Sequence, residues 1–558
     1  MRSPVFPCAA ARTSPARPAG LLCAALLLAG CGEHRSSPAT RADGAPTGSG
    51  MPSPAARGSA VPVPSLPGGA AAAPTPTSRG DAGAAEPRAP AAAAPAGDRI
   101  YSRVRFLWIR PQPGPTQAWL GYLSLGDSVR VRGGDAAQAL VASGIADGDR
   151  CRSWYAVEPR GYVCVGLDAT LDAHDPLVIE LGKTAADRRS PWPYQYGESI
   201  GTPVYASIPD DATQRRSEPD LAQHLERAAR ARAATSPEEI GRIDPTLVGV
   251  PLEPTGIEPP PPVTLDPLGR SLWSRVVRGS TVAYSRAFDH AGRSWLLTWD
   301  WGVVPRDRVR PYPSSSFAGV PLDGDHRLPI AFFRQKPRPK YRRSADGAVE
   351  PTGESWPRLG WVGLTDESVQ SGGQRYLATQ DQGLLCAEDD ATVIASAKTL
   401  PPAIAARTTG RRTWVEVSVL GGWLIAYEAE RPVFATLVSP GRGGIPFPGI
   451  PPLRTASTPL GQFTVTGKFL TATMVSSSEP TLVHTEVQYT QNFSGPHTLH
   501  GAYWHDDWGE RKSGGCVNLS PFDAQRLFEW SEPTLPEGWH GVRWIPGEGD
   551  STAVLVHR

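Results

Sequence analysis

This chain of 558 residues lacks several features that assign a protein to a class. It has no excess of charge, because 56 Lys and Arg residues are balanced by 55 Asp and Glu residues for a formal net charge of +1. That balance argues against a nucleic-acid-binding protein and against a strongly acidic partner. After the first thirty residues, no apolar run is long enough to cross a bilayer as a helix. Cysteine is scarce, with seven in total, so each one can be accounted for.

The first thirty residues have the pattern of an export signal. A basic start precedes a short apolar core, Leu21 to Gly30, which is too short for a permanent transmembrane helix. Leu-Ala-Gly-Cys, ending at Cys31, resembles a bacterial lipobox, which implies a lipoprotein signal peptide at 1–30 and a lipid on the Cys31 sulfur. Gly32 resembles a signal for sorting to the outer membrane. We therefore expect a lipid-anchored protein on the periplasmic face of that membrane. An ordinary signal peptide with an accidental cysteine is the alternative.

The remaining cysteines divide into three kinds. Two cysteines leave with the leader and Cys31 is used by the lipid, which leaves four. Cys151 and Cys164 flank a hairpin-like segment, so a disulfide between them is expected in an oxidising periplasm. Cys386 lies among apolar residues and is expected in a core. Cys516 then remains as the candidate reactive thiol.

The composition changes along the chain and predicts a series of modules. Residues 31–98 are mostly Ala, Pro, Gly and Ser, which is typical of a disordered tether because little apolar surface can be buried. Strand-like segments at 99–182 are similar to bacterial SH3-like barrels. Residues 183–270 read as a helical and Pro-rich connector, and 271–412 as a second β-rich module with a lead-in to the C-terminal domain.

Three helices are expected, and capping residues mark the start of two of them. The segment 219–243 favours a helix with Leu221, Leu225 and Ala228 on one face, and Ser236 before Pro237 marks the start of a second one. Near the C-terminus, a serine, a proline and an acidic residue at 520, 521 and 523 make a strong start for the third.

The segment from His500 to Asn518 is the most informative part of the sequence. It supplies a histidine and, sixteen residues later, Cys516 in a Ser-Gly-Gly-Cys turn. A thiol nucleophile needs an imidazole to remove its proton and backbone N–H groups to receive an oxyanion. Glycines before the cysteine allow consecutive amides to point at one place.

The order of these motifs resembles the catalytic domain of the L,D-transpeptidases, the YkuD-type family. Besides His-Gly and Ser-x-Gly-Cys, the chain has Thr-Pro-Leu-Gly-Gln-Phe at 458–463, which resembles the TPxGxF turn and strand of that family. Strand-like segments at 414–444 resemble its opening β-meander. The resemblance covers 413–546 and leaves 547–558 as a C-terminal tail. Where the family has a second histidine after the serine, this chain has Gly514.

The resemblance implies a mainly β protein whose C-terminal domain is a β-sandwich, preceded by the small β-barrel modules and the tether. It implies that Cys516 is the nucleophile and that His500, oriented by the backbone carbonyl of Gly501, is the base. The oxyanion would be held around Gly515 and Cys516, in a turn that begins at Ser513. No cofactor is implied.

The loop between the histidine and the cysteine is expected to contact the substrate. Tentative binding residues are Tyr503, Trp504, His505, Arg511 and Asn518. Nearby cations would lower the thiol pKa.

A metal site is the rival interpretation of this segment. His497, His500, His505 and Asp506 lie close in sequence, but their intervals match no known zinc spacing on a helix, so no metal is expected.

Two classes of function remain open. The first is an enzyme acting on peptidoglycan stem peptides, either forming 3-3 crosslinks through a cysteine thioester or hydrolysing the same bond as an L,D-carboxypeptidase or amidase. The acceptor of the acyl group would be another stem, a protein lysine or a free D-amino acid, and water would be the acceptor in hydrolysis. The second is a catalytically silent lipoprotein that binds the cell wall, and the intact Cys516 and His500 favour the first class. Papain-like hydrolases place the cysteine before the histidine, the reverse of the order here.

Overall fold

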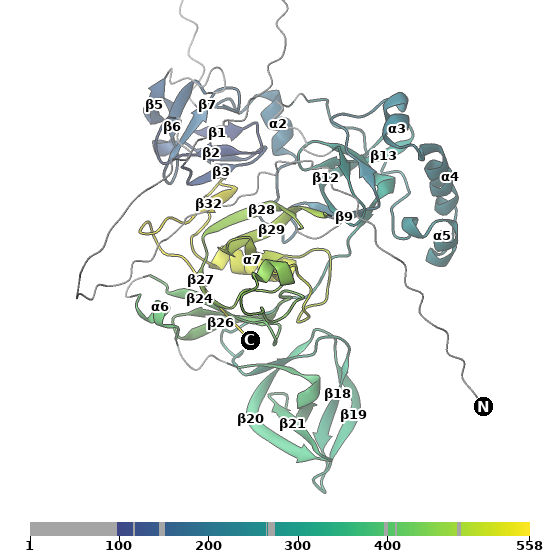
Figure 1. Cartoon of the computed structure of the whole chain (residues 1–558), viewed down its shortest axis with the longest axis vertical. Coiled ribbons are helices and arrows are strands. Elements are labelled where there is room, and N and C mark those ends of the chain that lie inside the picture. The colour runs from purple at the N-terminus through teal and green to yellow at the C-terminus, as the bar shows by residue number, and fades with distance from the viewer. Residues whose placement is uncertain are drawn as a thin grey trace, which may run out of the picture. The chain divides into compact units, whose positions relative to one another are not determined.

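The computed structural model describes residues 97–114, 118–143, 151–263, 265, 274–395, 400–407, 410–476 and 481–558. The expected signal peptide, the expected lipidation site at Cys31 and nearly all of the expected tether lie outside these residues. The described chain is mainly β, as predicted (Figure 1). None of the helices in this part of the chain is long and apolar enough to cross a membrane.

The first module is a set of short strands around an apolar core that includes Ile100, Ile109 and Val163. A disulfide joins Cys151 and Cys164, the expected pair, with their Cα atoms 5.4 Å apart. Its elements are β1 (Arg99–Ser102), β2 (Leu107–Ile109), β3 (Gly121–Leu123), β4 (Ser128–Arg130), α1 (Ala136–Ala139), β5 (Leu140–Ser143), β6 (Ser153–Ala156), β7 (Tyr162–Val165), β8 (Ala169–Thr170) and α2 (Pro176–Gly182).

A second β module is built from strands that are far apart in sequence. Strand β9 (Gln195–Ser199) pairs with β12 (Thr281–His290) and with β15 (Val309–Pro311). Residues 183–270, which were expected to form a helical and Pro-rich connector, therefore also contribute a strand, β9, to this sheet. A five-residue strand whose partners lie more than eighty residues away gives little local signal. The other strands are β10 (Thr202–Pro203), β11 (Arg275–Val276), β13 (Arg293–Thr298) and β14 (Val303–Pro305).

Three helices are inserted in this module: α3 (Asp211–Ser217), α4 (Leu221–Arg232) and α5 (Pro237–Ile243). The Ser236 side chain caps α5 as predicted, accepting a hydrogen bond from the Glu239 N–H at 3.2 Å. Leu225, expected on the buried face of α4, is 39% exposed. Its neighbour His224 is buried instead, because the buried stripe follows positions 221, 224, 228 and 231.

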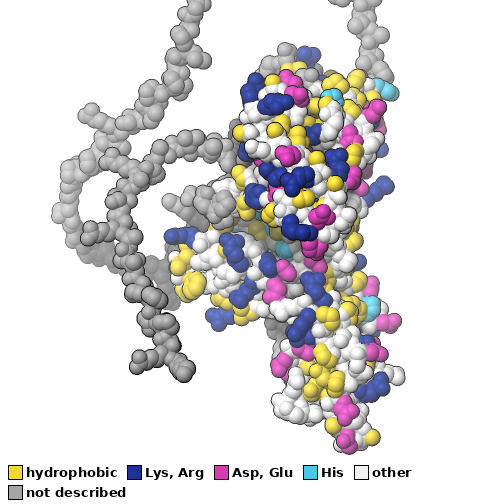
Figure 2. Space-filling view, turned by 90° about the vertical axis from the view of Figure 1, so that its right-hand side faces the viewer, with side chains coloured by type: hydrophobic (Ala, Val, Ile, Leu, Met, Phe, Trp, Pro, Cys, Tyr) yellow, Lys and Arg dark blue, Asp and Glu magenta, His cyan; other side chains and the backbone are white. Residues whose placement is uncertain are grey.

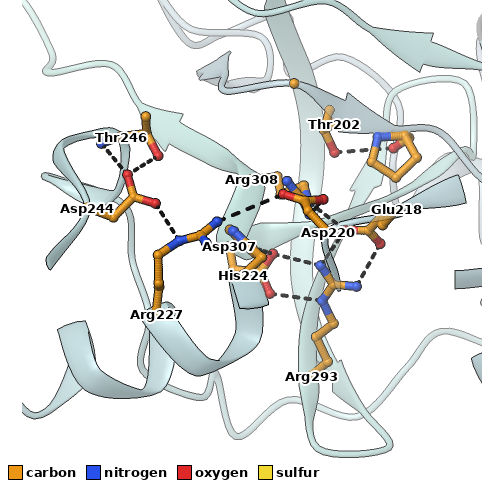
Figure 3. Close-up of polar contacts among 12 residues, drawn as sticks. Thr202, Glu218, Asp220, His224, Arg227, Asp244, Thr246, Arg293, Asp307 and Arg308 are labelled. Carbon is orange, nitrogen blue, oxygen red and sulfur yellow. Dashed lines mark hydrogen bonds and ion pairs between the residues drawn. The ribbon is translucent and has the colours of Figure 1, made fainter. Parts of the chain in front are cut away.

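A buried ion network attaches these helices to the sheet (Figure 3). The Arg293 guanidinium lies 2.8 Å from both the Glu218 and the Asp307 carboxylates. Arg308 also reaches Glu218, and His224 contacts Asp307 at 3.1 Å. Although burial opposes them, hydrogen bonds with His224 and Arg293 and the charge of Arg293 hold the pKa of Asp307 well below its usual range. Removing one member would leave a buried charge unpaired, which costs about 3–5 kcal/mol.

A third sheet of seven strands follows, in the order β19-β18-β22-β21-β20-β17-β23. Cys386 is fully buried in its core, as predicted. The region 271–412 thus contains strands of two separate β modules rather than one. The strands are β17 (Ile330–Phe332), β18 (Arg338–Arg343), β19 (Val349–Trp356), β20 (Trp361–Ser371), β21 (Gln374–Thr379), β22 (Leu384–Ala387) and β23 (Thr392–Ile394).

The C-terminal domain has two sheets and one long helix around a shared core. The predicted meander is present as β24 (Thr413–Ser418), β25 (Trp423–Glu428) and β26 (Arg431–Leu437), paired antiparallel in order. β16 (Val320–Pro321) and β27 (Gly461–Thr464) complete this sheet with β33 (Ala553–His557), and α6 (Pro402–Ala405) precedes it. The second sheet contains β28 (Gly467–Val475), β29 (Val483–Ser494), β30 (His497–Gly501), β31 (Val517–Leu519) and β32 (Gly541–Arg543).

The helix α7 (Pro521–Trp530) lies over β28 and β29 in Figure 1. Ser520 caps it as predicted, accepting a hydrogen bond from the Asp523 N–H at 3.1 Å. Leu527 and Phe528 are buried in the core between the sheets.

The prediction that residues 547–558 form a C-terminal tail outside the domain is wrong. β33 lies inside the first sheet, parallel to β24 and antiparallel to β27. Val554 and Val556 point into the core, and the alternating burial of this strand follows from its alternating side chains. The short segment carries a strand pattern, but its partner begins 140 residues earlier, at Thr413.

The second sheet of this domain is extended at both edges by the earlier modules. β29 pairs with β12 at Thr281, and β32 pairs with β3 at Gly121. At the second junction, Asp127 accepts a hydrogen bond from Arg188 at 2.7 Å and lies 3.0 Å from His540 Nδ1. These two partners hold the pKa of Asp127 at about 2, although burial opposes them.

On the face drawn in Figure 2, Lys and Arg side chains are mixed with Asp and Glu side chains.

Candidate active site

The pairing of β30 with β31 brings the two halves of the sequence motif together. The strands run parallel, with His500 opposite Asn518. Cys516 immediately precedes β31, so its side chain lies on the same face as that of Asn518. On β30, Thr498 and His500 share a face in the same way, and the Thr498 hydroxyl lies 3.5 Å from the Cys516 sulfur. The imidazole and the thiol therefore belong to one face of the sheet.

His500 is held by its own backbone. Nδ1 lies 2.9 Å from the carbonyl oxygen of Gly501, the acceptor expected from the resemblance. Because a carbonyl only accepts, Nδ1 carries the hydrogen and Nε2 keeps a lone pair. The ring is buried, and burial lowers the His500 pKa to about 4. The imidazole is therefore neutral at pH 7 and can accept a proton.

The Cys516 thiol is half-buried, and burial raises its pKa. Hydrogen bonds from the side chain and the backbone of Thr498 oppose that effect without overcoming it. The expectation that nearby cations lower the thiol pKa is not met. Lys512 forms an ion pair with Asp507 at 2.8 Å, and Arg511 is exposed. The resting site thus has a neutral thiol and a neutral imidazole.

The turn before the cysteine is organised by Ser513. Its hydroxyl accepts a hydrogen bond from the Gly515 N–H at 3.1 Å and donates one to the Cys516 carbonyl at 2.5 Å. The Gly515 N–H is therefore engaged inside the turn in this structure, and its expected oxyanion role stays a prediction. Gly515 has φ +133°, and a Cβ there would lie 3.0 Å from His497 Nε2 and from the Ser457 carbonyl oxygen. Its role is to let the turn form.

The turn and strand that contain Thr458 support the nucleophile directly. The Thr458 hydroxyl accepts a hydrogen bond from the Gly441 N–H at 2.9 Å and contacts the Cys516 carbonyl at 3.4 Å. This contact gives a physical reason for the presence of both motifs, which are 58 residues apart.

Sequence reasoning missed two residues beside the nucleophile. Thr498 could have been found from its position two residues before His500 on one strand. His497 was considered only as a metal ligand, but its Nδ1 lies 3.0 Å from the Ser494 carbonyl and its Nε2 faces the backbone at Gly515. Burial lowers the pKa of His497 as well.

The aromatic loop after His500 has two parts with different surroundings. Trp504 lies over the base, with ring centroids 5.8 Å from His500 and 4.5 Å from His484. Tyr503 turns the other way and stacks on Tyr196 of β9 at 3.8 Å, while its hydroxyl lies 2.7 Å from that of Thr281. Tyr503 thus joins the domain to the second β module, whereas Trp504 packs against the His500 ring.

The other expected binding residues are spread around the site. The amide nitrogen of Asn518 lies 3.1 Å from Nε2 of His505, whose pKa burial lowers to about 4. Asp506 forms an ion pair with Arg358 of the third module at 2.9 Å, so it connects the loop to that module. Within the described ranges, no three His, Cys, Asp or Glu side chains come together as a group that could hold a metal ion.

Comparison with known proteins agrees with the motifs. Residues 412–549 match the model of the YkuD family, the L,D-transpeptidase catalytic domain. The C-terminal domain is an L,D-transpeptidase catalytic domain. No match to a curated protein was found.

Solved structures of L,D-transpeptidases are similar to part of the chain. A mutant of the Enterococcus faecium enzyme is 22% identical, with a TM-score of 0.20, and the match covers 26% of this chain and 49% of that one. The Mycobacterium smegmatis enzyme is 17% identical, with a TM-score of 0.21, and the match covers 40% of this chain and 77% of that one. L,D-transpeptidase 3 from Mycobacterium tuberculosis is 16% identical, with a TM-score of 0.20, and the match covers 40% of this chain and 81% of that one. The chain thus spans about half the length of the first of these structures.

The two glycines of the transpeptidase turn should respond differently to substitution. Gly515→Ala places a Cβ against His497 and the Ser457 carbonyl at a positive φ, so we expect loss of thiol reactivity toward iodoacetamide together with a lower melting temperature. Gly514→Ala is the matched control, because a Cβ there meets nothing within 4 Å. Equal behaviour of the two variants would contradict the turn geometry.

The pH dependence of alkylation tests the neutral pair. With the Cys516 pKa raised, the rate with iodoacetamide should climb through pH 7 to 9, with an apparent pKa above the ordinary value of about 8.5. Thr498→Val should slow alkylation at pH 7 by about tenfold, the effect of about one pKa unit, whereas Thr498→Ser keeps the hydroxyl and the rate. A rate plateau between pH 5 and 8 would instead indicate a thiolate–imidazolium pair.

Proposed function

We propose that the protein is a peptidoglycan L,D-transpeptidase that works through a thioester on Cys516. The observation that carries the proposal is that the Cys516 thiol and the neutral His500 imidazole lie on one face of the paired strands β30 and β31. The backbone carbonyl of Gly501 orients this imidazole, and both residues belong to the segment that matches the family model. The donor would be a tetrapeptide stem. Its tripeptide acyl group would be transferred through the carbonyl of the third residue, and its terminal D-alanine would leave.

The first half of the reaction forms the acyl-enzyme. The Cys516 sulfur attacks the carbonyl carbon of the third stem residue while His500 removes the thiol proton. Collapse of the tetrahedral intermediate breaks the C–N bond to D-alanine, and His500 returns the proton to the leaving amine. Because both groups start neutral, the charge on sulfur develops only during attack.

The oxyanion of this intermediate needs backbone donors close to the sulfur. The Gly515 amide is engaged by Ser513, which leaves the amides of Gly514 and Cys516 as the candidates within this turn. Thr498 supports the sulfur from the facing strand and helps it to carry negative charge.

The second half depends on what reaches the thioester. An amine of a neighbouring stem, bound and oriented, has a large effective concentration over water and would give a 3-3 crosslink. Trp504 packs against the His500 ring and would help to exclude water. Hydrolysis in the same site would make the protein an L,D-carboxypeptidase, and an amine of a protein would attach that protein to the wall.

The proposed compartment follows from the N-terminal sequence. The lipobox-like segment ending at Cys31 would anchor the chain to the outer membrane, facing the periplasm, and the tether at 31–98 would let the domains reach the wall. The SH3-like character of the first and second modules remains part of this proposal, as a means of holding the wall.

Product analysis with purified disaccharide-tetrapeptide tests the reaction. We expect crosslinked dimers as the main product, with free tripeptide as a minor one. Cys516→Ala should abolish both, because it removes the nucleophile, and His500→Ala nearly so. Cys386→Ala, a thiol buried in the third module, is the control and should keep turnover. If the wild-type protein released only tripeptide in the presence of excess acceptor amine, it would be a carboxypeptidase. Product formation by the Cys516→Ala variant would contradict the thiol mechanism.

Membrane fractionation tests the anchor. Cys31→Ser should release the protein from membranes and leave its turnover unchanged, because the lipid and the nucleophile are on different segments. Unchanged membrane association would show that Cys31 carries no lipid.

A further inference from the structure

A pocket of about 580 Å³ includes Tyr503 in its lining and has no role in the chemistry above. It is formed by the segment that connects α2 to β9, by β12, by the end of β15 and by the loop after His500. Its volume is within the range of about 300–1,000 Å³ found for small-molecule sites. Six of its lining residues are aromatic: Trp192, Tyr194, Tyr196, Tyr284, Tyr312 and Tyr503.

The polar groups of this pocket make it unlike an apolar core. Tyr194, Tyr284 and Tyr312 line the pocket, and each carries a hydroxyl group that can donate or accept a hydrogen bond. Lys183 and Asp187, both exposed, add a cation and an anion at the wall. Aromatic faces combined with hydroxyl and charged groups suit a ligand with apolar ring faces and polar edges.

The pocket is held in place by contacts with the catalytic domain. The Tyr489 hydroxyl donates a hydrogen bond to the Ser190 carbonyl at 2.6 Å, and the Trp192 ring packs edge-on against Phe522 of α7 at 5.1 Å. These contacts fix the connecting segment that forms one wall.

The pocket is also linked to the catalytic base by touching side chains. Tyr312 contacts Tyr503, with ring centroids 5.7 Å apart. Tyr503 lies edge-on to Trp504 at 5.0 Å, and Trp504 lies over His500 at 5.8 Å. A ligand in the pocket could therefore contact Tyr312 and Tyr503, which are connected to the His500 ring through Trp504.

We propose that this pocket binds a sugar unit of the glycan strand that carries the stem peptide. The ring face of a pyranose would stack on Trp192 or Tyr312, the two half-buried aromatic residues of the lining, because Tyr196 and Tyr503 already stack on each other. Its hydroxyl and acetamido groups would bond to hydroxyl groups of the lining and to Lys183 and Asp187. The inference rests on the proposed function, because it places the sugar beside the peptide that is cut. The pocket would select glycan-linked stems over free peptides.

Binding of an N-acetylated amino-sugar disaccharide without peptide tests the pocket. We expect saturation-transfer NMR and calorimetry to detect binding to the full-length protein. Tyr312→Ala should weaken it by about tenfold, the loss of about 1.4 kcal/mol that one aromatic contact can supply. Gln195→Trp, a substitution at an exposed lining residue, should obstruct the pocket and weaken binding independently of Tyr312 packing. Tyr341→Ala removes a half-buried tyrosine of the third module and is the matched control.

Steady-state kinetics separate this inference from the proposed function. Tyr312→Ala should raise KM for disaccharide-tetrapeptide about tenfold more than KM for the sugar-free tetrapeptide, since only the former reaches the pocket. No disaccharide binding, or equal weakening in Tyr341→Ala, would overturn the inference. An equal rise in both KM values would also overturn it and assign the pocket to the peptide. If wild-type protein turned over neither substrate while still binding the disaccharide, the proposed function alone would fail.

Discussion

The parallel pairing of β30 with β31 is the constraint on which the site depends. Leu499, Val517 and Leu519 on one face of these strands enter the core, which fixes the register. The other face then carries His500 and Thr498 from one strand and Cys516 from the edge of the next. A slip of one residue would turn the thiol into the core and the apolar residues outward. Core packing and catalytic geometry are therefore set by the same contact.

Burial sets the chemistry of this arrangement. It lowers the His500 pKa and raises the Cys516 pKa, so the resting pair is neutral. Such a pair places no charge in a poorly solvated site before substrate arrives. The hydrogen bonds from Thr498 and the amides of the turn then stabilise charge on sulfur and on the oxyanion when it appears. The site is organised for the transition state rather than for a resting thiolate.

Local patterns predicted much of the fold and the central pair. The meander at 414–444, the cap at Ser520 and the His-Gly and Gly-Cys motifs depend on neighbours in sequence. β9 and β33 were missed because their partners lie far along the chain. Tyr503 was expected to line the groove, but it stacks on Tyr196, a contact between modules that no single-domain motif encodes. The direction of the Cys516 pKa shift was predicted wrongly. The neighbouring cations Arg511 and Lys512 suggested a lowered pKa, but burial of the thiol, which the sequence does not show, raises it.

The central claim is that a stem peptide is held on one sulfur. It is tested most directly by the mass of the intact protein after rapid mixing with tetrapeptide and acid quenching, followed by peptide mapping. The account predicts an added mass equal to the tripeptide acyl group, on the peptide that contains Cys516, which hydroxylamine removes. Turnover with no adduct at any time, or an adduct on another residue, would contradict it.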